Sequence, residues 1–164
     1  MSFLATHRRN ILDKTVITYR DIQIGDVLEF RYKNKKDKVT KIRVVLVVNI
    51  FPVTGSRKDK KVHAFSLPEL SPGVFKRLLK RIGTPLLRFD ERKKKEVSSV
   101  VIKEQGKKGE IFYRKVSSKF NTYNAYRTYI MSDMKAIKLC EYDWKNKQLG
   151  LGIKDEDLLQ DTDA

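Results

Sequence analysis

The stretch Val39–Phe51, VTKIRVVLVVNIF, decides the fold that we expect from this sequence. Alternate residues from Ile42 to Ile50 are apolar, which is the period of a β-strand, and Val45 and Val47 make the other face apolar as well. A strand that is apolar on both faces lies in the centre of a sheet. The sequence therefore predicts a central strand over these residues.

A second strand is expected just before it, over Val27–Tyr32, where apolar residues alternate after a turn at Gly25-Asp26. The polar connection Lys33–Lys38 has the length of a hairpin tip, and we interpret it either as a solvated tip or as a finger that contacts phosphate groups. We expect the domain to start at Ile22, so residues 1–21 are predicted to form an N-terminal arm.

A short helix is the clearest element after the loop Pro52–Lys61 and a strand over Val62–Leu67. It is predicted to begin behind an N-cap serine, Ser71, with proline in the first helical position and Gly83 at its end. The apolar residues at helical spacing are Val74, Phe75, Leu78, Leu79 and Ile82.

The second half of the chain predicts a hairpin and a second helix. Strands over Val97–Lys103 and Glu110–Val116 are expected to pair through a glycine-flanked tip at 104–109. Tyrosines spaced by three favour a helix from Tyr123 to about Asp133, followed by a strand over Ala136–Glu141. The expected fold class is α+β: a small, mostly antiparallel SH3-like β-barrel with one or two short helices, occupying residues 22–144, with a linker and acidic tail over 145–164.

The charge of the chain points to its partners. The formal net charge is +16 and the pI is about 9.9. Five acidic residues lie between 155 and 164, so residues 1–154 carry 36 basic and 15 acidic side chains, a net charge of +21. A field of this sign attracts polyanions, so we expect nucleic acid, through backbone contacts, or acidic surfaces of other proteins as partners.

Lysine clusters occur around residues 35, 58, 92–95 and 107, and the predicted helix has a basic outer face. If the tips project from one end of a barrel, they form a single anion-binding rim; otherwise they are solvated surfaces. The candidate phosphate or carboxylate contacts are Lys58, Lys60, Lys61, Arg77, Lys80, Arg81, Lys93, Lys94, Lys107 and Lys108.

Two further groups of residues have open interpretations. Tyr126 and Tyr129, beside Arg127, are either core residues or a stacking platform for unpaired nucleotides. Leu158 and Leu159, within the acidic tail, belong either to a mobile tail or to a docking peptide.

The sequence argues against several classes of protein. A single cysteine, Cys140, excludes an internal disulfide, and with only His7 and His63 it cannot assemble a structural zinc site. There is no phosphate-cradling glycine motif, no nucleophile motif and no apolar run long enough for a membrane span. We therefore expect no enzyme activity, no cofactor and no metal.

One local motif has an enzymatic counterpart. Ile24–Val27 followed by Ile42–Asn49 resembles the opening of the MazF and PemK type toxin ribonucleases, which are small barrels. This resemblance implies that Arg43 would stabilise a pentacovalent phosphate. Val44 stands where that family has proline, so we take from it the barrel and keep the ribonuclease as an alternative only.

A broader pattern is similar to small basic virion proteins of large contractile-tailed phages, including DNA end protectors. It consists of Gly25–Tyr32, then Val62–Leu67 running into a short helix, and finally Tyr126–Tyr129 before Ile137–Trp144. The resemblance implies a non-enzymatic structural or assembly role in the neck, tail or baseplate of a virion made in the host cytoplasm, within an oligomeric assembly. A cellular nucleic-acid-binding module is the alternative.

Overall fold

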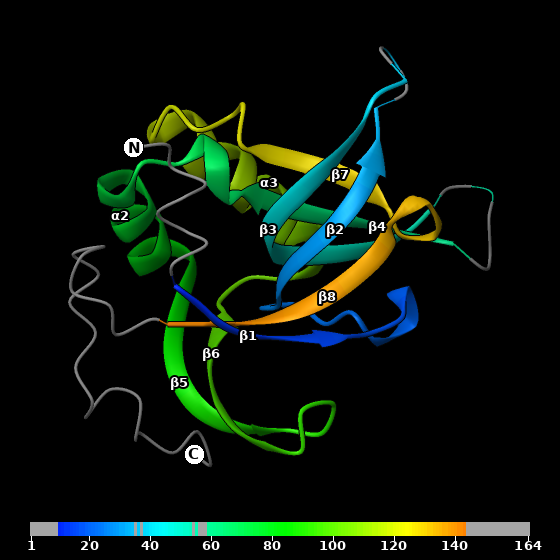
Figure 1. The fold of residues 1–164 in the computed structure, drawn as a ribbon. Coiled ribbons are helices and arrows are strands. Elements are labelled where there is room, and N and C mark those ends of the chain that lie inside the picture. Colours follow the sequence, from blue (N-terminus) through cyan, green and yellow to red (C-terminus); the bar gives the residue numbers. More distant parts are fainter. Residues whose placement is uncertain (1–9, 35, 37, 54, 56–58, 144–164) are drawn as a thin grey trace.

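The computed structural model describes residues 10–34, 36, 38–53, 55 and 59–143 (Figure 1). Short 3-10 helices lie at Tyr19–Asp21, Leu67–Glu69 and Met131–Asp133. In chain order, the strands and α-helices are β1 (Ile11–Val16), β2 (Val27–Lys33), β3 (Thr40–Pro52), β4 (Lys60–Ser66), α2 (Pro72–Ile82), β5 (Gly83–Asp90), β6 (Lys95–Ile102), α3 (Gly106–Lys119), β7 (Tyr126–Ile130) and β8 (Lys135–Tyr142).

The strands form a six-stranded sheet in the order β1-β8-β2-β3-β4-β7 and a separate two-stranded hairpin, β5-β6. All strand pairs are antiparallel. The predicted α+β class with a mostly antiparallel sheet is confirmed. Among the described strands, β1 and β7 end the order as edges and no closed barrel forms.

The central strand is confirmed, because β3 pairs with β2 on one side and with β4 on the other. The side chains on its two faces belong to two separate hydrophobic cores. Val44, Leu46 and Val48 belong to the core beneath α2 and α3, while Val45 and Val47 belong to a core on the opposite face of the sheet. Burial on both faces explains the nearly continuous apolar run.

The predicted N-terminal arm is partly wrong. Residues Ile11–Val16 form β1, which pairs with β8 at the edge of the sheet. Leu12 is 62% exposed and Val16 is 79% exposed, because an edge strand here buries few of its side chains. The weak apolar pattern of this strand follows from its edge position.

The predicted strand over Glu110–Val116 is also wrong, because these residues lie in α3. The buried residues of that helix are Tyr113, Val116 and Ser117, together with Gly109, and their spacing is helical. The strand over Val97–Lys103 is confirmed as β6, but it pairs with β5.

The predicted helix from Tyr123 to about Asp133 is a strand, β7, followed by a 3-10 turn. β7 pairs with the outer edge of β4, where it satisfies backbone groups that would otherwise be unpaired. In this strand Tyr126 packs against the core beneath the helices, and Tyr129 lies in the opposite core. A spacing of three therefore places the two rings on opposite faces, as the strand period requires.

Candidate nucleic-acid interface

Helix α2 is positioned by its own sequence signals. The Ser71 Oγ accepts a hydrogen bond from the Val74 backbone N–H at 3.3 Å, and Pro72 occupies the first turn. Phe75, Leu78, Leu79 and Ile82 are buried, which leaves the basic residues on the other side. The predicted helix is confirmed.

Gly83 follows this helix for a different reason from the one predicted. Its φ of −158° is extended backbone, so no left-handed cap is formed. A Cβ at this position would lie 2.5 Å from Val100 Cγ1 and 3.0 Å from the Val101 carbonyl oxygen. The glycine is required because β6 passes so close.

Helix α3 is held to the sheet at its first residue. The buried Asn49 side chain of β3 accepts a hydrogen bond from the Gly106 N–H at 3.0 Å and donates one to the Gly106 carbonyl at 2.8 Å. The Tyr113 hydroxyl donates to the Glu104 carbonyl oxygen at 2.7 Å, and burial raises the pKa of this hydroxyl well above its usual value. These bonds fix which side of α3 faces solvent.

Lys103, which lies between β6 and α3, forms hydrogen bonds with the end of α2. Its backbone N–H donates to the Ile82 carbonyl at 2.9 Å, and its Nζ donates to the Lys80 carbonyl at 3.3 Å. The connection that precedes α3 therefore lies against the end of α2, and both helices pack against the same core.

Together, α2, α3 and the connection before α3 form a surface that we call the helical basic surface. Residues 72–82 and 103–119 carry ten basic and only two acidic side chains. Five of the basic residues were predicted from the sequence, and the structure places them on these two helices: Arg77, Lys80, Arg81, Lys107 and Lys108. The remaining five are Lys76, Lys103, Arg114, Lys115 and Lys119.

Few of the positive charges on this surface are neutralised by acidic side chains of the same surface. Within the described ranges, the single ion pair on it joins Arg114 to Glu110, at 2.8 Å. Like charges spaced by four residues on a helix repel one another. An external polyanion would relieve that repulsion, since each phosphate contact also releases bound counterions.

The other predicted basic residues do not join this surface. Lys60 and Lys61 begin β4 and Lys94 is exposed in the β5–β6 turn, while Lys58 lies outside the described residues. The β2–β3 tip and the β5–β6 turn lie at separate corners of the molecule, and Lys107 lies in α3 and not in a hairpin tip (Figure 1). The described clusters, around residues 35, 92–95 and 107, therefore do not form a single anion-binding rim.

Lys93 is placed inside the protein. Its side chain is 3% exposed, its Nζ has no hydrogen-bond partner, and it lies 3.9 Å from an Asp13 carboxylate oxygen. A side chain so enclosed cannot reach a phosphate backbone. The sequence of the cluster at 92–95 does not indicate that Lys93 is buried, because this burial depends on how the β5–β6 hairpin packs against the main sheet.

Arg92, in the same cluster, holds the β5–β6 hairpin against the main sheet. It donates two hydrogen bonds to Asp26, at 2.7 and 2.8 Å, and two to Asp90, at 2.8 and 3.1 Å. Burial raises the pKa of Asp26, and the hydrogen bonds from Arg92 oppose that rise. Burial would also raise the pKa of Asp90, but Arg92 outweighs it and lowers that pKa.

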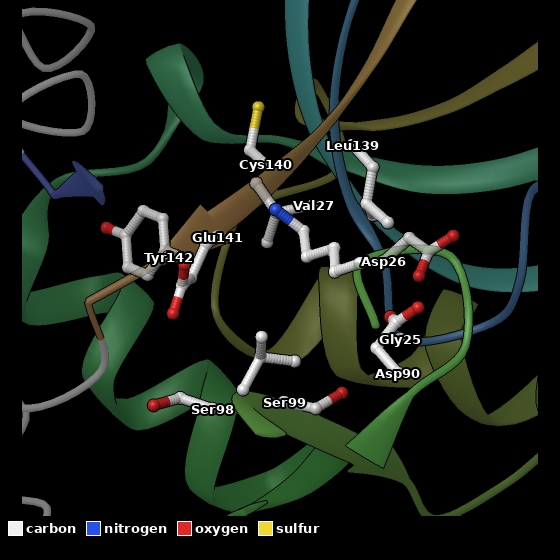
Figure 2. Close-up of a pocket in the computed structure, with 12 residues that line it drawn as sticks. Gly25, Asp26, Val27, Asp90, Ser98, Ser99, Leu139, Cys140, Glu141 and Tyr142 are labelled. Carbon is white, nitrogen blue, oxygen red and sulfur yellow. The ribbon is translucent and has the colours of Figure 1, made fainter. Parts of the chain in front are cut away.

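Beside this network lies a small pocket. Figure 2 shows Asp26 and Asp90 together on one side of it, with Cys140, Glu141 and Tyr142 of β8 on another. Its volume of about 20 Å³ is room for a water molecule and not for a substrate. Burial raises the pKa of the Cys140 thiol to about 11, so this cysteine is not a reactive nucleophile.

The predicted stacking residues are not available as a platform. Tyr129 is 3% exposed and contacts the edges of Phe30 and Tyr32. Tyr126 is half-buried against His63, and Arg127 lies 3.6 Å from a carboxylate oxygen of Glu69. The interpretation of these tyrosines as core residues fits their burial.

Arg43, the residue implied by the ribonuclease resemblance, is half-buried beside β2. It shares a face of the sheet with Val45, whereas His63 lies on the opposite face against Tyr126. The structure therefore does not bring Arg43 and His63 together as a phosphate-stabilising and proton-transferring pair.

The described residues form neither a metal site nor a membrane-spanning helix. Within the described part of the chain, no cluster of three or more histidine, cysteine or carboxylate side chains could hold a metal ion. No helix there has both the length and the apolar character that a membrane span needs. Leu158 and Leu159 lie outside the described residues.

Comparison of the chain with protein-family models, with curated proteins and with solved structures finds no match. The resemblance to phage virion proteins therefore rests on the sequence pattern alone.

Proposed function

We propose that this protein is a non-enzymatic, basic structural or assembly protein of a phage particle, which binds the phosphate backbone of nucleic acid through the helical basic surface. The observation that carries the proposal is that surface: ten basic side chains against two acidic ones on two adjoining helices.

Backbone binding is favoured over base reading by the character of the surface. Lysine and arginine side chains recognise phosphate by charge, which carries no sequence information. The predicted stacking residues, Tyr126 and Tyr129, are half-buried and buried respectively, so they do not add a platform for unpaired bases. We therefore expect duplex DNA to bind with little sequence preference.

The virion context comes from the sequence resemblance and from the extreme charge. The SH3-like barrel stays a prediction, since the described strands form an open sheet with two edge strands and not a closed barrel. A neighbouring protein subunit with an acidic surface is the second partner that the same cations would suit.

The experiment is a titration of fluorescent 30-base-pair DNA with the full chain between 50 and 200 mM salt. Six or more phosphate contacts would weaken binding by roughly 10³-fold or more over this range. Replacing Arg77, Lys80 and Arg81 with glutamine should lower the slope of log K against log salt by about 2 to 3, since each lost contact removes about 0.9.

A matched variant controls for net charge. Lys36, Lys41 and Arg88 are exposed and away from the helices, so their replacement with glutamine removes the same charge. We expect this control to keep the parental slope. Equal losses in both variants would contradict a localised interface, and a folded parent that is not retained on DNA at 50 mM salt would favour the acidic protein partner.

A further inference from the structure

A second basic feature lies at the far end of the sheet from the helices. A groove of about 720 Å³ forms where the β2–β3 tip meets the start of β8. We call it the tip groove. Its lining residues are Arg31, Lys33, Asn34, Lys38, Thr40, Asp133 and Lys135.

The strand register explains why these side chains gather. Arg31 of β2 lies opposite Ile42 of β3 and opposite Lys135 of β8, and Lys33 lies opposite Thr40. Residues opposite each other in antiparallel strands project to the same face. The face thus presents cations around Ile42, which is 46% exposed.

The groove carries an unbalanced charge. Four of its lining side chains are basic, and one, Asp133, is acidic. Within the described ranges, no ion pair involves Arg31, Lys33, Lys38 or Lys135. Its exposed surface is nevertheless mostly apolar, because the aliphatic stems of the long basic side chains form its walls.

A cationic groove with apolar walls suits an acidic peptide that carries aliphatic side chains. Residues 155–163 of this chain, DEDLLQDTD, have five carboxylates and no basic residue, with two leucines in the middle. We infer that this segment docks into the tip groove of its own chain. Leu158 and Leu159 would lie against the basic stems and against Ile42, which is opposite Arg31 at the side of the groove, and the carboxylates against the four cations.

The chain is long enough for this contact. Lys135 lies in the groove and begins β8, which ends at Tyr142, so the strand places Asp143 roughly 25 Å from the groove. The residues from Asp143 to Leu158 can span up to about 50 Å when extended. The proposal is independent of nucleic-acid binding, which is assigned to the helices.

The test measures the backbone mobility of Leu158 and Leu159 by ¹⁵N relaxation in the full chain at low salt. Docking should give order parameters above about 0.6, the value below which backbone is flexible. Replacing Lys33, Lys38 and Lys135 with glutamine should lower both values below about 0.6. Ile42→Ser, which changes no charge at an exposed position, should have a smaller effect in the same direction.

The control variant replaces Lys107, Lys115 and Lys119 of α3 with glutamine, which removes the same charge from exposed positions. It should leave the mobility of both leucines unchanged. Mobile leucines in the parent chain, or release by the α3 variant and not by the groove variant, would overturn the proposal. Order parameters that rise with protein concentration would overturn docking within one chain and show that a second copy receives the segment.

Discussion

The strongest structural prediction concerns Arg92, which joins the β5–β6 hairpin to the main sheet. Its side chain is 12% exposed, and its main partner Asp26 is 5% exposed. Besides its four hydrogen bonds to the two carboxylates, it donates one to the Asp21 carbonyl at 2.9 Å. Arg92→Met keeps much of the side-chain volume but leaves the Asp26 carboxylate buried without a cation.

Removing one partner of a buried ion pair costs about 3 to 5 kcal/mol, because the remaining charge stays desolvated. Domains of this size unfold with about 5 to 15 kcal/mol, so we expect Arg92→Met to remain folded at low temperature with a sharply reduced free energy of unfolding. Urea unfolding followed by circular dichroism at pH 7 measures the difference.

Two further measurements separate the ion pair from a general packing defect. The double variant Arg92→Met, Asp26→Asn should be more stable than Arg92→Met alone, since asparagine leaves no buried charge and can still accept the hydrogen bond from the Gln23 N–H. Without Arg92 the pKa of Asp26 lies still higher, so protonation favours the folded state. The deficit of the single variant should therefore shrink as the pH falls through that pKa.

Arg88→Met supplies the control, because Arg88 is exposed on the same hairpin. Its cost should stay within about 0.5 kcal/mol. If Arg92→Met were as mild as this control, or if the Asp26→Asn change gave no recovery, the assignment of Arg92 as the residue that holds the hairpin would be refuted.

Three other predictions concern the stability or reactivity of single residues. Burial lowers the pKa of His63, so the unfolded chain takes up its proton at a higher pH than the folded chain. Stability should therefore fall as the pH falls through about 6.5, the ordinary histidine pKa, and His63→Gln should remove this pH dependence in urea titrations. Gly83→Ala should destabilise the protein by about 1 to 3 kcal/mol through contact with Val100, whereas Gly73→Ala, with open space around its Cβ, should be neutral or slightly stabilising in thermal unfolding. Cys140, buried and with a pKa of about 11, should react with a thiol reagent at neutral pH only after denaturant is added; rapid modification of the native protein would contradict its placement in the core.

Local patterns in the sequence were sufficient for several elements. The double-sided apolar run of β3, the alternation of β2, and the capping serine and proline of α2 each predict the structure that is found. These signals depend on neighbouring residues alone, since period and cap chemistry are local properties. The basic outer face of α2 follows from the same helical spacing.

The sequence alone also determined that this protein presents an excess of positive charge, because net charge does not depend on the fold. The tertiary structure decided where that charge lies. β7 is a strand because its backbone pairs with the edge of β4, and α3 is held to the sheet because Asn49 of β3 binds its first residue. Arg92 and Lys93 look like their surface neighbours in the sequence, yet docking of the hairpin buries them. Contacts between residues far apart in the chain thus separated the cations that face a partner from those that hold the protein together.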